Sequence, residues 1–136
     1  MPDLLVDISD GIATLTLNRP EARNALSLEM RSMLRESFHE IELNDAVRVV
    51  VIRGAGEHFM AGGDIKSMST IIDKPGDEIR NQFITRIHDL HPIMYSMRRM
   101  AKPIIASVAG AAAGAGVSFA LASDIVIADA EAFFTL

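Results

Sequence analysis

The sequence predicts an α/β fold in which parallel strands alternate with helices. Apolar runs rich in β-branched residues, typical of buried parallel strands, occur at residues 47–52, 104–108 and 125–128. Between these runs, apolar residues recur at the three- and four-residue spacing of amphipathic helices. No low-complexity linker interrupts the pattern, so we expect one domain over residues 1–136.

The chain is expected to begin with a β-hairpin. Apolar residues cluster or alternate at 4–8 and 13–17, on either side of Asp10-Gly11, a pair that favours a two-residue turn. After the turn-forming Asn18-Arg19-Pro20, Ser27 can cap a helix that ends near Asp45. The apolar residues that give this helix its periodicity are Met30, Met33, Leu34, Phe38 and Ile41.

Further along, each predicted strand is followed by a glycine-containing loop and a helix. Residues 54–63 form a loop, and a short helix starts at Asp64. A long amphipathic helix covers about 77–100. A Gly/Ala turn then follows the second apolar run and leads into a helix that ends near Ala122. Residues 133–136 are again apolar and strand-like.

The composition argues against several classes of function. The 136 residues are 49% hydrophobic, enough for one compact core. A net charge of −5 without a basic stripe argues against nucleic-acid binding. The absence of cysteine removes disulfides and thiolate chemistry and fits a reducing cytoplasm. Acidic residues near the N-terminus, where an export signal carries positive charge, argue against secretion.

One uncharged stretch, residues 103–123, has about the length that spans a bilayer. Alanine, glycine and serine dominate it, Pro103 opens it, and the helical pattern covers only its second half. We therefore expect a buried strand, a turn and a closely packed helix here, and no membrane partner.

Two strand–glycine–helix segments, 49–65 and 104–121, repeat one design. Backbone amides at a helix start carry partial positive charge and lack intrahelical partners, and glycine lets a ligand approach them closely. Together the segments suggest a two-donor pocket for an oxyanion. For either segment alone, tight packing of a helix against a strand explains the small residues as well.

Several short motifs share one order and spacing with a known family. They are Asn18-Arg19-Pro20 with Asn24-Ala25-Leu26, the FMAGGDIK segment from Phe59 to Lys66, Lys102-Pro103, the GAAAGAG segment from Gly110 to Gly116, and Ser123-Asp124-Ile125. In this series the chain resembles the crotonase, or enoyl-CoA hydratase/isomerase, superfamily along essentially its whole length.

The resemblance implies a crotonase-like ββα spiral, here incomplete because family members are about twice this length. It implies an enzyme that acts on acyl-CoA thioesters, with no cofactor beyond the CoA of the substrate and no metal. The two oxyanion-hole donors fall on the N–H groups of Gly63 and Ala115. Full-length members form trimers or hexamers, so the resemblance also implies a homo-oligomer.

The family's adenine and pantetheine contacts fall on residues around the first glycine turn, namely Ala22, Arg23, Ala25, Ala61, Asp64 and Ile65. Lys66 stands where a phosphate-facing lysine is often found. Alternatively, Arg23 and Lys66 are ordinary solvated cations.

The resemblance leaves the reaction open. Ser118 stands where hydratases of this type carry a glutamate, and a serine cannot replace a carboxylate base, which argues against two-glutamate hydration. A hydroxyl that bonds back to the preceding turn is the simpler role for Ser118. Residues 112–118 look more like the phenylacetate-pathway and Δ3,Δ2-enoyl-CoA isomerase branch, and a second family glutamate falls just after Leu136. The alternative is a non-catalytic acyl-CoA-binding or subunit-association fragment.

Histidines and methionines give weaker signals. His88 and His91 have an i,i+3 spacing that permits metal binding, but a solvated or helix-capping role is simpler. His58 lies beside the first glycine loop, where it either contacts CoA or only supports the turn. Most methionines have helical spacing and are expected in the core or an acyl pocket: Met30, Met33, Met68, Met94, Met97 and Met100.

Overall fold

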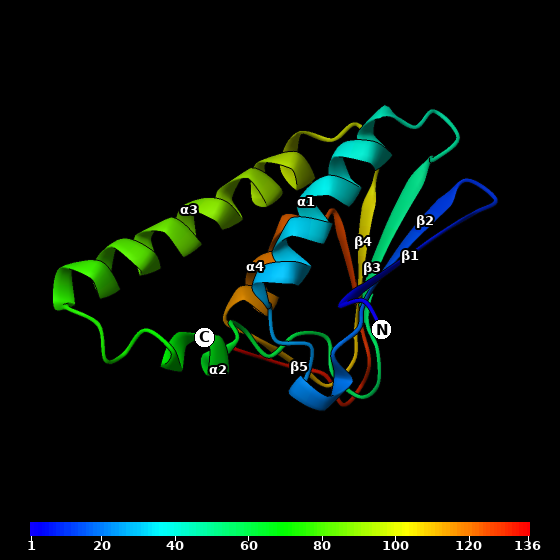
Figure 1. Cartoon of the computed structure of the whole chain (residues 1–136). Coiled ribbons are helices and arrows are strands. Elements are labelled where there is room, and N and C mark those ends of the chain that lie inside the picture. The colour runs from blue at the N-terminus through cyan, green and yellow to red at the C-terminus, as the bar shows by residue number, and fades with distance from the viewer.

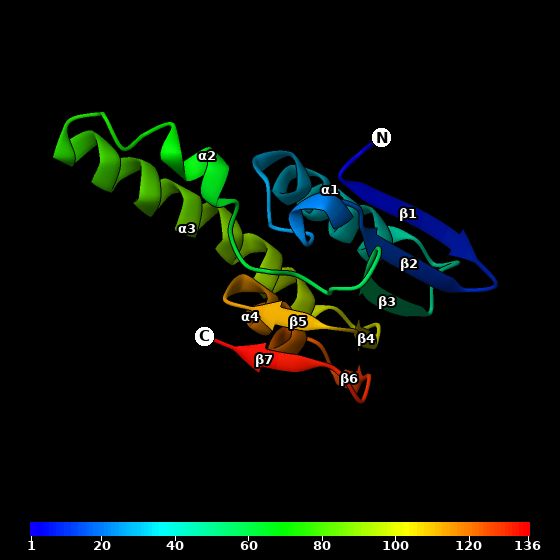
Figure 2. The same ribbon diagram turned by 90° about the horizontal axis from the view of Figure 1, so that it is seen from below.

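The computed structural model describes all 136 residues and confirms the α/β class. A five-stranded sheet has the order β1-β2-β3-β4-β6, and a separate two-stranded sheet pairs β5 with β7 (Figures 1 and 2). The strands are β1 (Leu4–Ser9), β2 (Ile12–Leu17), β3 (Val49–Gly54), β4 (Ile104–Val108), β5 (Ala111–Ala113), β6 (Ile125–Ala128) and β7 (Phe133–Thr135). The helices are the 3-10 turn η1 (Pro20–Ala22) and α1 (Leu28–Leu43), α2 (Ile65–Ser69), α3 (Gly76–Arg99) and α4 (Ala115–Ala122).

The predicted hairpin is present. Asp10 and Gly11 have φ angles of 52° and 80°, so both residues of the turn are left-handed, as this turn requires. Pairing between β1 and β2 is antiparallel, whereas β2–β3, β3–β4 and β4–β6 are parallel. The expected parallel sheet is therefore confirmed, with one antiparallel strand at its edge.

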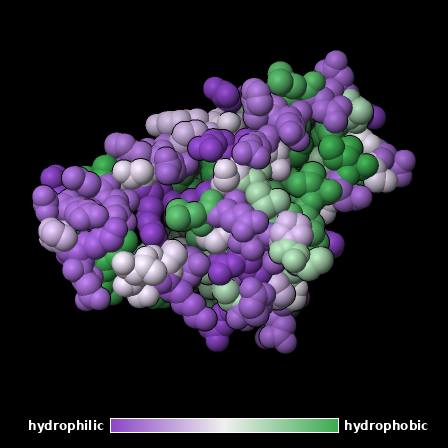
Figure 3. All heavy atoms as spheres, in the orientation of Figure 1, coloured by the Kyte–Doolittle hydropathy of each residue, from purple (hydrophilic) through white to green (hydrophobic).

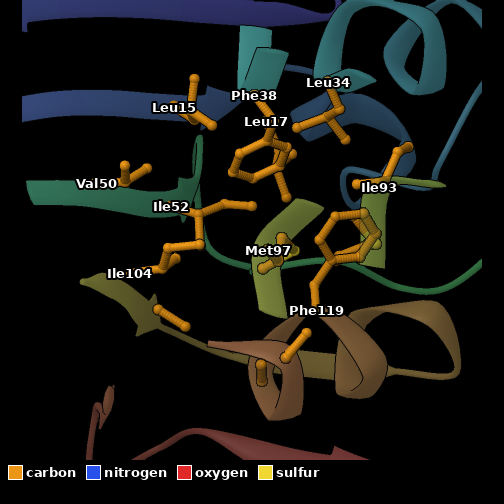
Figure 4. Close-up of a cluster of buried hydrophobic side chains, with 14 of the residues drawn as sticks. Leu15, Leu17, Leu34, Phe38, Val50, Ile52, Ile93, Met97, Ile104 and Phe119 are labelled. Carbon is orange, nitrogen blue, oxygen red and sulfur yellow. The ribbon is translucent and has the colours of Figure 1, made fainter. Parts of the chain in front are cut away.

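Helices α1, α3 and α4 lie on one face of the large sheet (Figures 1 and 2). The Ser27 hydroxyl accepts a hydrogen bond from the Met30 N–H at 3.0 Å, which confirms the predicted helix cap. Between helices and sheet lies a core of aliphatic, aromatic and methionine side chains (Figure 4). The labelled members are Leu15, Leu17, Leu34, Phe38, Val50, Ile52, Ile93, Met97, Ile104 and Phe119.

The uncharged stretch folds as β4, β5 and α4, and both Ile104 and Phe119 are completely buried. The prediction of a strand, a turn and a packed helix is thus correct except that the turn contains β5. This strand is built of three alanines, which have little preference for strands. Backbone pairing with β7 and a bridge from Met60 to Ala112 impose the extended conformation. None of the helices combines the length and apolar character needed to cross a membrane.

Hydrophilic residues dominate the surface at the α3 side, and hydrophobic residues gather where the sheet lies (Figure 3). The strand β6 has exposed apolar side chains along its length, and β7 exposes both of its phenylalanines.

Candidate active site

The two glycine turns face each other at one end of the sheet. A Cβ atom added to Gly114 would lie 3.7 Å from the Cα of Gly62, and one added to Gly62 would lie 3.4 Å from the Ala113 carbonyl oxygen. The turns are held together by backbone bonds, because the Ala113 N–H donates to the Met60 carbonyl at 2.9 Å. The predicted two-turn arrangement is therefore present in the fold.

Glycine is needed in these turns for two different reasons. Gly62 has a φ angle of 89°, and Gly114 has φ 51° with ψ −115°, conformations that side chains disfavour. Gly116 has an ordinary φ, but a Cβ atom there would lie 2.3 Å from the Met60 carbonyl oxygen. Close packing thus explains Gly116, while backbone conformation explains Gly62 and Gly114.

The N–H groups of Gly63 and Ala115 donate to no acceptor within the chain. Ala115 is the first residue of α4, so its N–H lies at the positive end of the helix dipole. The neighbouring Gly114 N–H is used, because it donates to the Thr135 carbonyl at 3.0 Å. Facing turns therefore carry two unused donors, the requirement for binding a developing oxyanion.

A pocket of about 320 Å³ opens beside the first turn. It is lined by Ala22, Arg23, Ala25, Ala61, Gly63, Asp64, Ile65 and Lys66. The structure thus brings together all seven residues that the family resemblance gives for CoA, together with one of the two donors. A cavity of similar volume, about 340 Å³, lies between Leu28 and the polar side chains of α3, and it contains none of these residues.

Backbone contacts join the two halves of this pocket. The Ala61 N–H donates to the Arg23 carbonyl at 3.0 Å, and the Leu26 N–H donates to the Gly62 carbonyl at 2.8 Å. Arg23 itself has a positive φ of 50°. The loop after η1 therefore runs alongside the first glycine turn and forms part of the pocket wall.

The charged residues of the pocket have different surroundings. The Asp64 carboxylate accepts from the Lys66 and Ser67 N–H groups and forms an ion pair with Arg19 at 3.2 Å, so it is engaged in holding the turn. Arg23 and Lys66 are exposed and form no ion pair within the chain. These two cations are thus available to an anionic ligand at the pocket.

Ser118 is exposed on α4, and its hydroxyl makes no hydrogen bond within the chain. The predicted bond from this hydroxyl to the preceding turn is therefore wrong. One turn earlier, the Gly114 carbonyl already accepts the Val117 and Ser118 N–H groups. Ser123, by contrast, does donate its hydroxyl to the Phe119 carbonyl at 2.9 Å.

The three histidines considered above do not form one cluster, because His58 lies apart from His88 and His91. The Nδ1 atom of His58 accepts from the Ala111 N–H at 3.1 Å, which supports the structural role for this residue. His88 and His91 are exposed on α3 with ring centroids 5.6 Å apart, and no third metal-binding side chain joins them. Sequence reasoning missed Asn24 as a functional candidate, although this buried polar residue stands next to Arg23.

The sequence model of the family described as "Enoyl-CoA hydratase/isomerase" matches residues 7–136. The chain belongs to this family. It is 35% identical over 136 residues to the 1,2-epoxyphenylacetyl-CoA isomerase of Escherichia coli, covering 100% of the chain and 51% of that protein. Like this relative, the other curated members that it matches are about twice its length.

Solved structures of crotonases have the same fold. An enoyl-CoA hydratase from Mycobacterium smegmatis superposes with a TM-score of 0.89 at 36% identity, covering 98% of this chain and 50% of the other. A monofunctional enoyl-CoA isomerase from M. smegmatis gives a TM-score of 0.78 at 32% identity, with 98% and 53% covered. The predicted crotonase-like spiral is confirmed as a partial one.

Proposed function

We propose that the protein acts on an acyl-CoA thioester and stabilises its enolate through the Gly63 and Ala115 amides. The observation that carries this proposal is the pair of unused N–H groups on facing glycine turns, one of them in the wall of the pocket. A thioester oxygen gains negative charge as the enolate forms, and preplaced donors stabilise that charge in the transition state.

The pocket suits coenzyme A. Arg23 and Lys66 supply unpaired positive charge for phosphates, and the small or apolar residues Ala22, Ala25 and Ile65 offer a surface for the adenine and pantetheine groups. We further propose a homo-oligomer, a trimer or hexamer, that works in the cytoplasm and needs no cofactor besides the CoA of its substrate.

Of the reactions open to this family, we favour double-bond isomerisation over hydration. Hydration by two carboxylates needs a base near the α4 start, where this chain has Ser118. The Asp64 carboxylate cannot take that role freely, because Arg19 and the start of α2 already engage it. Shifting a double bond needs only one group that moves a proton between two carbons.

Product analysis with a 3-enoyl-CoA and a 2-enoyl-CoA tests this preference in the full-length protein. We expect the 3-enoyl-CoA to be isomerised faster than the 2-enoyl-CoA is hydrated. A product that is chiefly 3-hydroxyacyl-CoA would overturn the preference for isomerisation and leave the acyl-CoA assignment intact.

A second candidate is an acyl-CoA-binding or subunit-association role without turnover. The ion pair between Asp64 and Arg19 favours this second candidate, because it leaves the Asp64 carboxylate unavailable as a base near the two amide donors. Ser118, at the position of the hydratase glutamate, has no carboxylate. Calorimetry separates the two candidates: the binding role predicts CoA affinity in the full-length protein with no change in any enoyl-CoA.

A further inference from the structure

Asn24 is a completely buried polar side chain at the junction of three segments. Its Nδ2 donates to the Ala55 carbonyl at 2.9 Å and to the His58 carbonyl at 2.7 Å, and its Oδ1 accepts from the Arg19 N–H at 2.8 Å. Both amide hydrogens and the amide oxygen are therefore used. The residue also holds a left-handed φ of 56°, which asparagine tolerates better than most side chains.

The Asn24 side chain is closely packed on all the sides that its partners occupy. A Cβ atom on Gly54, at the end of β3, would lie 2.7 Å from Asn24 Nδ2 and 2.0 Å from the His58 carbonyl oxygen. Glycine at this position lets the strand end approach both groups. The amide of Asn24 thus sits in a fixed gap between the strand end and the first glycine loop.

His58 extends this connection to the second turn. Its Nδ1 accepts from the Ala111 N–H, so the ring must present an unprotonated Nδ1. Backbone bonds run alongside, from the Phe59 and Met60 N–H groups to the Ala111 carbonyl at 3.1 Å. A Cβ atom on Gly110 would lie 2.5 Å from His58 Nδ1, so the histidine ring packs directly on the chain that leads to Ala115.

We propose that Asn24 and His58 are positioning residues that fix the first glycine turn against the second and thereby set the separation of the Gly63 and Ala115 amides. This inference rests on the proposed function, because it gives the separation a catalytic meaning. Asn24 holds the carbonyl of His58, and the His58 ring holds the N–H of Ala111. Oxyanion donors must be placed to within about 0.5 Å of the productive geometry, so slack between the turns reduces turnover.

Four variants of the full-length protein test the proposal. Asn24→Asp keeps an oxygen that can accept from the Arg19 N–H. It replaces the NH₂ group that donates to the Ala55 and His58 carbonyls with a second oxygen, which cannot donate. His58→Leu removes the ring nitrogen, whereas His58→Asn can place an amide oxygen near the Nδ1 position. Asn18→Asp is the matched control, because the partly exposed Asn18 Nδ2 donates only to the Pro2 carbonyl at 3.0 Å.

We expect Asn24→Asp and His58→Leu to lower kcat by about 100-fold, the loss that a displacement near 1 Å produces. His58→Asn should restore most of the rate, and Asn18→Asp should match the unmodified protein. In the His58 pair, CoA affinity should stay unchanged while kcat falls in His58→Leu and recovers in His58→Asn, which separates positioning from a general structural role. An unchanged kcat in His58→Leu, or a loss confined to CoA affinity, would overturn the proposal.

Hydrogen exchange of the same variants keeps this test independent of the proposed function. His58→Leu should speed exchange at residues 59–61 and 111–113, and the control should not. If the unmodified protein turns over no enoyl-CoA, the proposed function fails. Faster exchange confined to these two segments would still support the role of Asn24 and His58 in fixing one turn against the other. Unchanged exchange in both segments would refute that role. If Asn24→Asp does not fold, the His58 pair carries both measurements.

Discussion

At the scale of single residues, the glycines of this chain separate into conformational and packing positions. Gly62 and Gly114 have left-handed backbones, while Gly116 leaves room for the Met60 carbonyl. Gly63 belongs to neither group strictly, since a Cβ atom there would meet only the flexible end of Met68, at 2.7 Å. Its N–H, rather than its missing side chain, is thus the feature with a chemical use.

Proline substitutions test the donors directly. Gly63→Pro and Ala115→Pro each remove one N–H and should cost about 2.7–4 kcal/mol of transition-state stabilisation in the full-length protein. Proline is well tolerated at the first position of a helix, where Ala115 stands, so this variant is expected to fold. Gly63→Ala and Ala115→Ser, which keep the N–H, are the matched controls. Steady-state rates on a short enoyl-CoA decide the matter, and unchanged turnover in both folded proline variants would remove the oxyanion-hole assignment.

At the scale of elements, local signals predicted most of the fold because they act within a few residues. The Asp10-Gly11 turn, the Ser27 cap and the spacing within α1 and α3 all depend on near neighbours. The strand β5 escaped prediction because its pairing partners, Met60 and β7, impose a conformation that alanines do not favour.

For the candidate site, too, some residues could be predicted from the sequence and others could not. Motif resemblance supplied the pocket residues, and the structure brings them together. The roles of Asn24 and His58 could not be read from the sequence, because their partners lie 31, 34 and 53 positions away. Local rules predicted a hydrogen bond from the Ser118 hydroxyl to the preceding turn, and the structure does not contain this bond.

The cap of α1 gives a prediction at this scale. Ser27→Ala removes the acceptor of the Met30 N–H and the donor to the Asp3 carboxylate, and should lower the free energy of unfolding by about 1 kcal/mol. Ser32→Ala is the control, because the Ser32 hydroxyl reaches only the exposed Glu36 side chain, at 3.5 Å. Denaturant titration of both variants measures the difference. Equal stability of the two would show that the cap contributes nothing.

At the scale of the whole molecule, two edge strands carry uncovered apolar surface. In β6, Ile125, Val126 and Ile127 are 51%, 43% and 61% exposed, and β6 pairs only with β4. In β7, Phe133 and Phe134 are 53% and 48% exposed, and β7 pairs only with β5. Open strand edges with apolar side chains are templates for association.

The 136-residue chain expressed alone is therefore expected to self-associate or to be poorly soluble, and to show no measurable turnover. The association follows from the open edges of β6 and β7. The lack of turnover follows from Ser118 and from the engaged Asp64 carboxylate, which leave the two donors without a proton-transfer group. Weak CoA binding should persist, because all seven residues predicted to contact CoA line one pocket of this chain.

Light scattering measures the self-association of the isolated chain, and an enoyl-CoA assay measures its turnover. Ile127→Lys combined with Phe134→Lys places a charge on each exposed edge and should reduce the scattering, because charged edge strands resist pairing. CoA affinity should be the same in this variant, since neither position lines the pocket. A soluble and active monomer of the unmodified 136 residues would contradict the prediction, and would require an acid or base among these residues that acts at the Gly63 and Ala115 amides.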